Sequence, residues 1–185
     1  MTKRRPRYCP YCGTELESRS FEGRERRFCS TCQECVFQNP VPVARVVVLD
    51  GDSALFVKRA EPPYQGVWTI PGGVLEVDEP AARGATRELR EETHLRTSFE
   101  DVELIYTDLN VDDPEDGSIL TICFAVERGR TIGVPQVGDE PSAVEFWDPQ
   151  QLADSAERTR SLDLRCIEAA FDRLRNEERK ITRGS

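Results

Sequence analysis

The stretch that decides the fold is GGVLEVDEPAARGATRELREETHL, residues 72–95. Near its end, Glu88, Glu91 and Glu92 are spaced three and four residues apart. In a helix this spacing brings the three carboxylates to one face. Like charges this close destabilise a helix by a few tenths of a kcal/mol per pair. The cluster is therefore either incidental to an acidic protein or a site for a cation.

The flanking residues favour the cation site. The pattern predicts a helix over residues 79–93, with a proline in its first turn and a turn at Gly72 and Gly73 before it. Glycines in the turn let bare backbone approach the carboxylates. Gly84, one turn before Glu88, is expected to leave room for a ligand. Three carboxylates and a backbone carbonyl are hard oxygen ligands, which suit Mg2+ or Mn2+ and not zinc.

The remainder of this helix has an apolar side and a basic side. The apolar side should face a sheet, and the basic side should lie away from the glutamates. The apolar side consists of Ala82, Ala85 and Leu89, and the basic side consists of Arg83, Arg87, Arg90 and His94.

Around the helix, extended and helical patterns mix without strict alternation. Strands are predicted at residues 43–50, 54–59, 102–110, 118–128 and 143–148. The first two are joined at Gly51-Asp52. Residues 67–77 are predicted to be extended, with an interruption at Pro71, Gly72 and Gly73. Helices are predicted at residues 149–155 and 161–179. This pattern indicates an α/β fold in which helices sandwich a mixed sheet.

The first 38 residues have a different signature. Cys9-x2-Cys12 and Cys29-x2-Cys32 predict a tetrahedral zinc site with four thiolate ligands. Cys35 repeats the spacing from Cys32, so the choice of ligands stays open. A segment this short cannot build much of a core, and the metal would supply its folding free energy. We therefore expect a zinc ribbon at residues 1–38 and a larger domain at 39–185.

Composition limits the classes of function. The 185 residues carry 34 acidic and 25 basic side chains, only three of them lysines, for a formal charge of −9. Such a balance suggests a salt-rich cytoplasm and makes nucleic acid an unlikely main partner. The ribbon mixes arginines with tyrosines, so contact with nucleic acid remains a minor alternative to a structural or dimer-forming role.

Location and redox state follow from what the sequence contains. No stretch approaches the ~20 apolar residues of a membrane span, and the N-terminus has no apolar signal region. Seven cysteines without an export signal indicate a reducing compartment. We expect a cytoplasmic protein in which Cys123 and Cys166, both in apolar runs, are small buried residues.

Residues 72–95 resemble the Nudix box, Gly-x5-Glu-x7-Arg-Glu-U-x-Glu-Glu-x-Gly-U, where U is aliphatic. The matching positions are Gly73, Glu79, Arg87, Glu88, Leu89, Glu91, Glu92 and Leu95. Only His94 departs, standing where the family has a glycine that ends the helix. We expect His94 to be tolerated there and activity to survive.

The resemblance spans about residues 40–150. With the ribbon before it, the chain is similar to zinc-ribbon Nudix hydrolases that act on FAD, ADP-ribose or NADH. It implies a Nudix α/β/α sandwich and hydrolysis of a nucleoside diphosphate linked to another moiety, with ADP-ribose, FAD and NADH as substrates in that order. The implied cofactors are Mg2+ or Mn2+ for the reaction and structural Zn2+ for the ribbon.

The resemblance also implies roles for the box residues. Glu88 and Glu92 would be the main metal ligands and Glu91 would share in metal binding. A backbone carbonyl of Gly73, or of Gly72, would complete the ligand set.

Other roles concern positioning and proton transfer. Arg87 would orient the glutamates through its pairing with Glu91, four residues on. The general base varies across the family. Glu140, in the loop before the strand at 143–148, is the first candidate, with Asp139 and Glu145 as rivals.

One alternative belongs to another class. A Nudix domain can serve as the ligand sensor of a transcription regulator, with the ribbon contacting nucleic acid. Sensors of that kind often lose box glutamates, and here all are kept. Similar families commonly form homodimers, although the sequence shows no interface.

Overall fold

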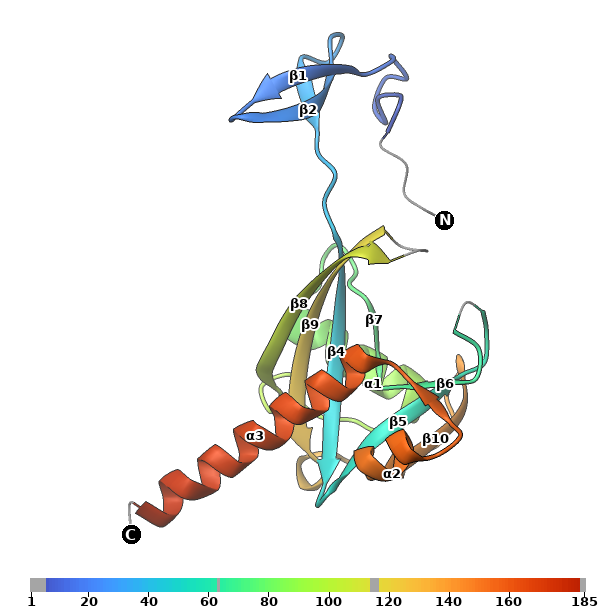
Figure 1. Ribbon diagram of the computed structural model, residues 1–185, viewed down its shortest axis with the longest axis vertical. Coiled ribbons are helices and arrows are strands. Elements are labelled where there is room, and N and C mark those ends of the chain that lie inside the picture. The colour runs from blue at the N-terminus through green and yellow to red at the C-terminus, as the bar shows by residue number, and fades with distance from the viewer. Residues whose placement is uncertain (1–5, 63, 114–116, 184–185) are drawn as a thin grey trace. The chain divides into compact units, whose positions relative to one another are not determined.

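The computed structural model describes residues 6–62, 64–113 and 117–183 (Figure 1). The chain divides into two compact units. One comprises residues 1–41 and 110–119, and the other comprises residues 42–109 and 120–185.

The N-terminal part contains a small antiparallel sheet. Its strands are β1 (Glu17–Phe21), β2 (Arg24–Cys29) and β3 (Glu34–Val36), in the order β1-β2-β3. The buried core of this part consists of Cys9, Leu16 and Cys29. Two of its three members are cysteines, so apolar burial alone contributes little to its stability.

A mixed sheet of eight strands forms the centre of the remaining chain. Its main path runs β11-β6-β5-β4-β9-β8; in addition β10 pairs with β5 and β7 pairs with β4. The pairing of β11 with β6 is parallel, and the pairings of β5 with β4, β6 and β10 are antiparallel. The strands are β4 (Val41–Asp50), β5 (Ser53–Arg59), β6 (Val67–Thr69), β7 (Gly72–Val74), β8 (Glu103–Asp113), β9 (Gly117–Glu127), β10 (Pro141–Trp147) and β11 (Arg158–Thr159).

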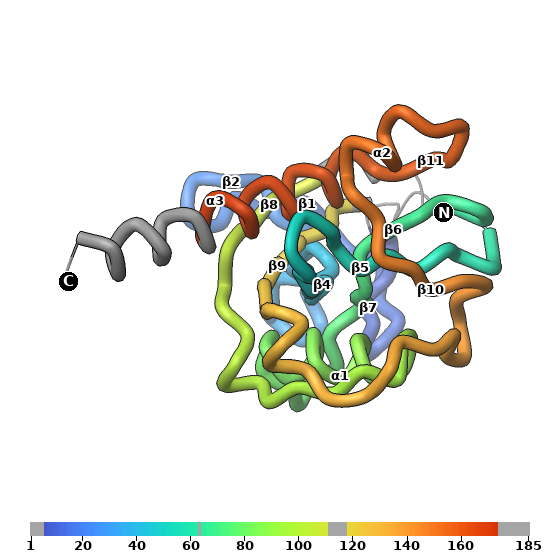
Figure 2. Tube along the Cα trace, turned by 90° about the horizontal axis from the view of Figure 1, so that it is seen from below, coloured from blue at the N-terminus to red at the C-terminus, as the bar shows by residue number. Residues whose placement is uncertain are grey.

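Helices cover both faces of this sheet, which is why the sequence of β4 is apolar almost throughout. Its alternate side chains join two separate cores. Ala44, Val46 and Val48 join the core that includes Ala85 and Leu89 of α1 (Ala81–Thr93). Val47 and Leu49 join the core on the other face, with α2 (Pro149–Asp154) and α3 (Ser161–Arg183). Figure 2 shows α1 on one side of the sheet and α2 with α3 on the other. The predicted α/β/α sandwich with a mixed sheet is confirmed.

Several local predictions hold and others need correction. Cys123 and Cys166 are fully buried, as expected. The turn at Gly51 joins β4 to β5, with Asp50 paired to Ser53. However, α1 begins at Ala81, with Pro80 as its N-cap residue and not inside its first turn.

Short elements were harder to foresee. The 3-10 turn at Arg128–Arg130 and the two-residue strand β11 were not predicted. Both are too short to produce a periodic pattern, and β11 is defined by its pairing with β6, which is far away in the sequence. Within the described residues, no helix is long and apolar enough to cross a membrane.

Candidate active site

Arg87 is the centre of the acidic face of α1. Its Nη1 donates to Glu88 Oε1 at 2.7 Å and to Glu91 Oε2 at 3.0 Å. Its Nη2 donates to Glu79 Oε1 at 2.7 Å and to the carbonyl of Val74 at 3.2 Å. The helical pattern placed Arg87 on the side away from the glutamates, and this was wrong, whereas the pairing with Glu91 that the resemblance implied is present. Its long side chain bends back across the helix surface, and one cation bridges three carboxylates.

This bridging explains how like charges are tolerated on one helix face. Hydrogen bonding to Arg87 holds the pKa of Glu79 below its usual range, and Glu79 in turn raises the pKa of Arg87. Glu79 also accepts a hydrogen bond from the backbone N–H of Glu76 at 3.0 Å. The loop before α1 is therefore held to the helix through Glu79.

The turn at Gly72 and Gly73 lies directly against the glutamates. The backbone N–H of Gly72 donates to Glu92 Oε2 at 3.0 Å. A Cβ atom added at Gly73 would lie 2.3 Å from Glu88 Oε1, far inside contact distance. At Gly72 an added Cβ would lie 2.4 Å from the carbonyl oxygen of Ala44 on β4. Only glycine permits this close approach of backbone to the carboxylates.

Burial raises the proton affinity of two of these carboxylates. Glu92 is 7% exposed, and burial raises its pKa to about 8 despite the hydrogen bond from Gly72. Burial also raises the pKa of Glu88, with Arg87 acting in the opposite direction. Glu91, whose side chain is 42% exposed, completes the set. Carboxylates placed at this cost of burial are oxygen donors of the kind that a hard divalent cation binds.

Gly84 does not have the role expected of it. An added Cβ atom there would lie 2.2 Å from Leu75 Cδ2 and 2.9 Å from Glu79 Oε1. The missing side chain makes room for the loop before α1, and not for a ligand. The helical pattern correctly indicated free space beside Gly84. Which group occupies that space depends on how the loop before α1 packs in the folded chain.

A second loop binds the C-terminal end of α1. The backbone N–H groups of Gln136 and Gly138 donate to the carbonyls of Thr93 and Glu92, both at 3.0 Å. Asp139 N–H donates to the carbonyl of Glu91 at 3.4 Å. These bonds satisfy carbonyls that a helix end leaves unpaired. They also fix residues 139 and 140 beside the acidic helix.

His94 ends the helix as anticipated. It is the C-cap residue with φ 60° and ψ 0°, and its N–H donates to the carbonyl of Arg90 at 2.9 Å. Its side chain is exposed. The left-handed conformation is the one in which the family uses glycine.

A cavity of about 360 Å³ opens beside Glu92. Glu140 and Asp139 both line it, and the charge of Glu140 adds to the burial that raises the pKa of Glu88 and Glu92. The third candidate base, Glu145, is an exposed residue of β10 that pairs with Phe56 and does not line this cavity. The structure therefore brings Glu140 and Asp139 to the carboxylates, and leaves Glu145 outside.

Two residues of this cavity were missed by sequence reasoning. Arg59 and Glu61, at and just beyond the end of β5, line it together with Val57, Ala60 and Pro141. The Nε atom of Arg59 is buried and has no hydrogen-bond partner within the described part of the chain. The sequence could have indicated Arg59, because it is a charged residue at the end of an otherwise apolar strand, and the segments that follow strands often carry binding groups.

The four predicted zinc ligands converge in the ribbon. Their sulfur atoms lie within 4.8 Å of one another, with 3.9 Å between Cys9 and Cys32 and 3.5 Å between Cys12 and Cys29. A tetrahedral ion with Zn–S bonds of about 2.3 Å places its sulfurs about 3.8 Å apart. The cluster fits zinc and does not include Cys35, which lies opposite Phe28 on β3.

Residues 39–168 match the NUDIX domain family. This span is well over half of the chain. The chain belongs to the Nudix family. The resemblance of residues 72–95 to the Nudix box is thereby confirmed, as is the predicted enzyme class, a Nudix-type nucleotide diphosphatase.

Curated relatives of the Nudix domain fall into several named types. A MutT-like protein of Streptomyces ambofaciens is 31% identical over 114 residues, which cover 62% of this chain and 67% of the relative. An ADP-ribose pyrophosphatase of Methanocaldococcus jannaschii is 25% identical over 117 residues, covering 63% and 67%. The NAD-capped RNA hydrolase NudC of Edwardsiella ictaluri is 29% identical over 90 residues, covering 49% of this chain and only 34% of the relative.

Solved structures agree on the fold. A Nudix hydrolase of Nitrosomonas europaea superimposes with a TM-score of 0.64 at 23% identity and covers 88% of each chain. The Nudix domain of Shewanella oneidensis NrtR, complexed with ADP ribose, has a TM-score of 0.63 at 23% identity and covers 75% of this chain and 90% of that one.

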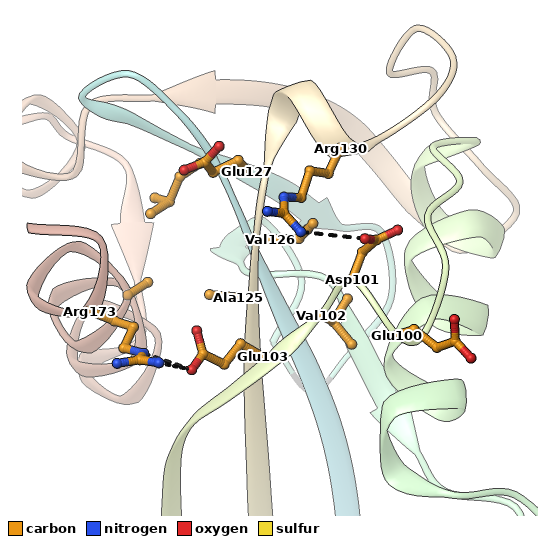
Figure 3. A pocket seen from close by; sticks show the side chains of 11 residues that line it. Glu100, Asp101, Val102, Glu103, Ala125, Val126, Glu127, Arg130 and Arg173 are labelled. Carbon is orange, nitrogen blue, oxygen red and sulfur yellow. Dashed lines mark hydrogen bonds and ion pairs between the residues drawn. The ribbon is translucent and has the colours of Figure 1, made fainter. Parts of the chain in front are cut away.

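The Nudix domain has a further cavity, of about 340 Å³, away from the box (Figure 3). Ion pairs of Asp101 with Arg130 and of Glu103 with Arg173 cross its rim. Its apolar lining comes from Leu49, Val102, Ala125, Val126 and Ala170. No predicted site residue is among the described residues that line it.

Proposed function

We propose that this Nudix protein hydrolyses the diphosphate bond of a nucleoside diphosphate linked to another moiety, in a reaction that depends on Mg2+ or Mn2+. The proposal rests mainly on one observation: Glu88 and Glu92 lie against the bare backbone of Gly72 and Gly73, with the pKa of both raised by burial. We place ADP-ribose first among the substrates, then FAD and NADH. The naming of one relative as an ADP-ribose pyrophosphatase and the ADP ribose held by a structural neighbour support ADP-ribose as the first choice.

Glu88 and Glu92 would hold the cation, with Glu91 sharing in this and a carbonyl of Gly72 or Gly73 completing the oxygen ligands. When bound, the cation neutralises charge on the diphosphate and makes water more acidic. Arg87 keeps the three carboxylates oriented, because it donates to Glu88 and Glu91 and is itself held by Glu79.

The cavity residues would act on water and substrate. Glu140 would accept the proton of the attacking water, whose oxygen forms a bond to one phosphorus while the bridging P–O bond breaks. The products are two phosphate monoesters. Arg59, which lines the same cavity and whose buried Nε has no hydrogen-bond partner within the described residues, would bind a phosphate oxygen.

The ribbon at residues 1–38 would hold one structural Zn2+ on Cys9, Cys12, Cys29 and Cys32, ahead of a Nudix domain at 39–185. Free thiols and a zinc cluster suit a reducing compartment, and we place the protein in the cytoplasm.

Hydrolysis should be measured on ADP-ribose, FAD, NADH and nucleoside triphosphates with Mg2+ or Mn2+, at low and molar salt, with phosphatase-coupled detection of the products. We expect strong turnover of one diphosphate-linked compound, lost in Glu92→Gln. Of the candidate bases, Glu140→Gln should lower kcat most, Asp139→Asn less, and Glu145→Gln not at all.

The failure of every compound with folded, metal-loaded protein would reject the enzyme and favour a ligand sensor. In that case calorimetric binding of ADP-ribose without turnover should be found. A uniform loss of activity in all three base variants would instead reject Glu140 as the base.

A further inference from the structure

One face of the ribbon sheet gathers aromatic rings and arginines. In the β1–β2 pairing, Phe21 is opposite Arg24 and Arg19 is opposite Arg26. Directly opposed residues project to the same face, and alternate residues along a strand share it. The aromatic–arginine face therefore consists of Arg19, Phe21, Arg24, Arg26 and Phe28, and Phe37 just after β3 joins it.

The rings and guanidinium groups of this face are interleaved. The Arg19 guanidinium lies 4.4 Å from the centre of the Phe28 ring, and that of Arg26 lies 5.3 Å from the centre of the Phe37 ring. The rings of Phe21 and Phe37 meet edge to face, with centres 6.5 Å apart. These contacts hold the side chains as an ordered surface.

Folding of the ribbon accounts for Phe28, which is buried, but not for the other rings of this surface. Its buried core is Cys9, Leu16 and Cys29, with Cys32 and Val36 packed around it. Phe21 and Phe37 remain 42% and 50% exposed. Two large exposed rings in so small a sheet cost solubility without adding to the core, which points to a bound partner.

Charge identifies the kind of partner. Residues 1–41 contain eight basic and five acidic side chains, whereas the whole chain has 25 basic and 34 acidic. The aromatic–arginine face carries three arginines, with only Glu17 as an acidic residue on its strand positions. A second copy presenting the same face would be repelled by like charge.

We propose that the aromatic–arginine face binds single-stranded nucleic acid, with bases stacked on Phe21 and Phe37 and phosphates bound by Arg19, Arg24 and Arg26. Stacking needs unpaired bases, so a duplex would bind less well. Strands of five or six residues are about 17 Å long, which accommodates roughly two or three bases. This binding is separate from the proposed hydrolysis, because none of its residues belongs to the Nudix box or the cavity beside it.

The test uses the full-length, zinc-loaded protein and fluorescence anisotropy. The probes are a labelled 12-nucleotide uridine RNA, the matching thymidine DNA and a 12-base-pair duplex, at salt from 20 to 200 mM. We expect both single strands to bind more tightly than the duplex. The difference in affinity between the RNA and the DNA shows whether the sugar contributes to binding. Phe21→Ala and Phe37→Ala should each weaken binding about tenfold. Arg24→Gln should reduce the slope of log K against log salt by about 0.7.

Matched controls come from the Nudix domain. Phe99 is 39% exposed and, like Phe37, lies beside an arginine; Arg96 is an exposed arginine. Phe99→Ala and Arg96→Gln should leave strand binding unchanged. All variants should keep their zinc content and their rate of small-nucleotide hydrolysis, which separates this test from that of the enzyme.

The proposal is overturned if no single strand binds at 20 mM salt, or if the control variants lose as much affinity as the face variants. It is also overturned if sedimentation finds a dimer that Phe21→Ala dissociates, because the face would then be an interface between copies.

Discussion

The two clusters of ligand-type side chains in this protein are held in opposite ways. The carboxylates of α1 lie on a helix whose other side packs Ala85 and Leu89 into a large apolar core. In the ribbon, by contrast, two of the four thiols belong to the core itself: Cys9 and Cys29 are two of its three buried members, and Cys32 packs against them. In the Nudix domain the fold positions the carboxylates, whereas in the ribbon the proposed zinc and its four thiolates would hold the fold. Changes to the two clusters should therefore have different consequences.

The largest expected effect is the loss of zinc from the ribbon. Binding of a structural zinc contributes on the order of 10 kcal/mol to the folding of a small domain. Chelation, or Cys29→Ser, should therefore unfold the ribbon while the Nudix domain keeps its unfolding temperature. Amide signals of residues 6–36 in NMR spectra and calorimetric unfolding would show this. Cys35→Ser, outside the cluster, is the control and should leave the zinc content unchanged.

A ligand change in the Nudix domain should have the reverse outcome. Glu92→Gln should lower kcat about a thousandfold, which corresponds to several kcal/mol of lost stabilisation by the bound cation. The unfolding temperature should stay about the same, because burial raises the pKa of Glu92 to about 8 and the neutral Gln resembles the protonated carboxyl. Gln also still accepts the hydrogen bond from Gly72. If Glu92→Gln unfolded the domain, the distinction between the two clusters would be wrong.

A smaller change tests how closely the fold positions the carboxylates. Gly73→Ala should displace the Glu88 carboxylate, which would lie 2.3 Å from the new Cβ atom. A shift of about 1 Å can lower kcat by roughly a hundredfold, whereas stability should change little because Glu88 can move. Gly129→Ala is the matched control, since an added Cβ meets nothing within 4 Å there. Equal kcat values for the two variants would contradict the close approach of the Gly72–Gly73 turn.

The smallest expected effect concerns the end of α1. His94 adopts φ 60°, which is unfavourable for a residue with a side chain. His94→Gly should stabilise the domain by about 0.5 kcal/mol, which is the relief of strain minus the greater freedom of glycine in the unfolded chain. His94→Ala keeps the strain and should not stabilise. Urea unfolding measures both, and an equal gain in the two variants would show that the imidazole and not the backbone is responsible.

Much of the architecture could be read from local patterns. Three patterns involve residues that are close in sequence: the spacing of Glu88, Glu91 and Glu92, the two Cys-x2-Cys pairs, and the apolar run of β4. Helix and strand periodicity converts such spacing directly into a shared face. These patterns were enough to predict the α/β/α sandwich, the acidic helix face and the cysteine cluster.

Other features depend on residues far apart in the sequence, and only the tertiary structure decided them. Arg87 turns toward the glutamates because Glu79 and the carbonyl of Val74 lie where β7 and its loop pack against α1. Glu140 reaches the cavity because its loop binds the last carbonyls of the helix. Arg59 joins them from the end of β5, and Phe37 meets Phe21 only across the paired strands of the ribbon. The sequence by itself determined which chemical groups share one element, since that depends on local geometry. Which groups from different elements meet was decided by packing and strand register, which no local pattern records.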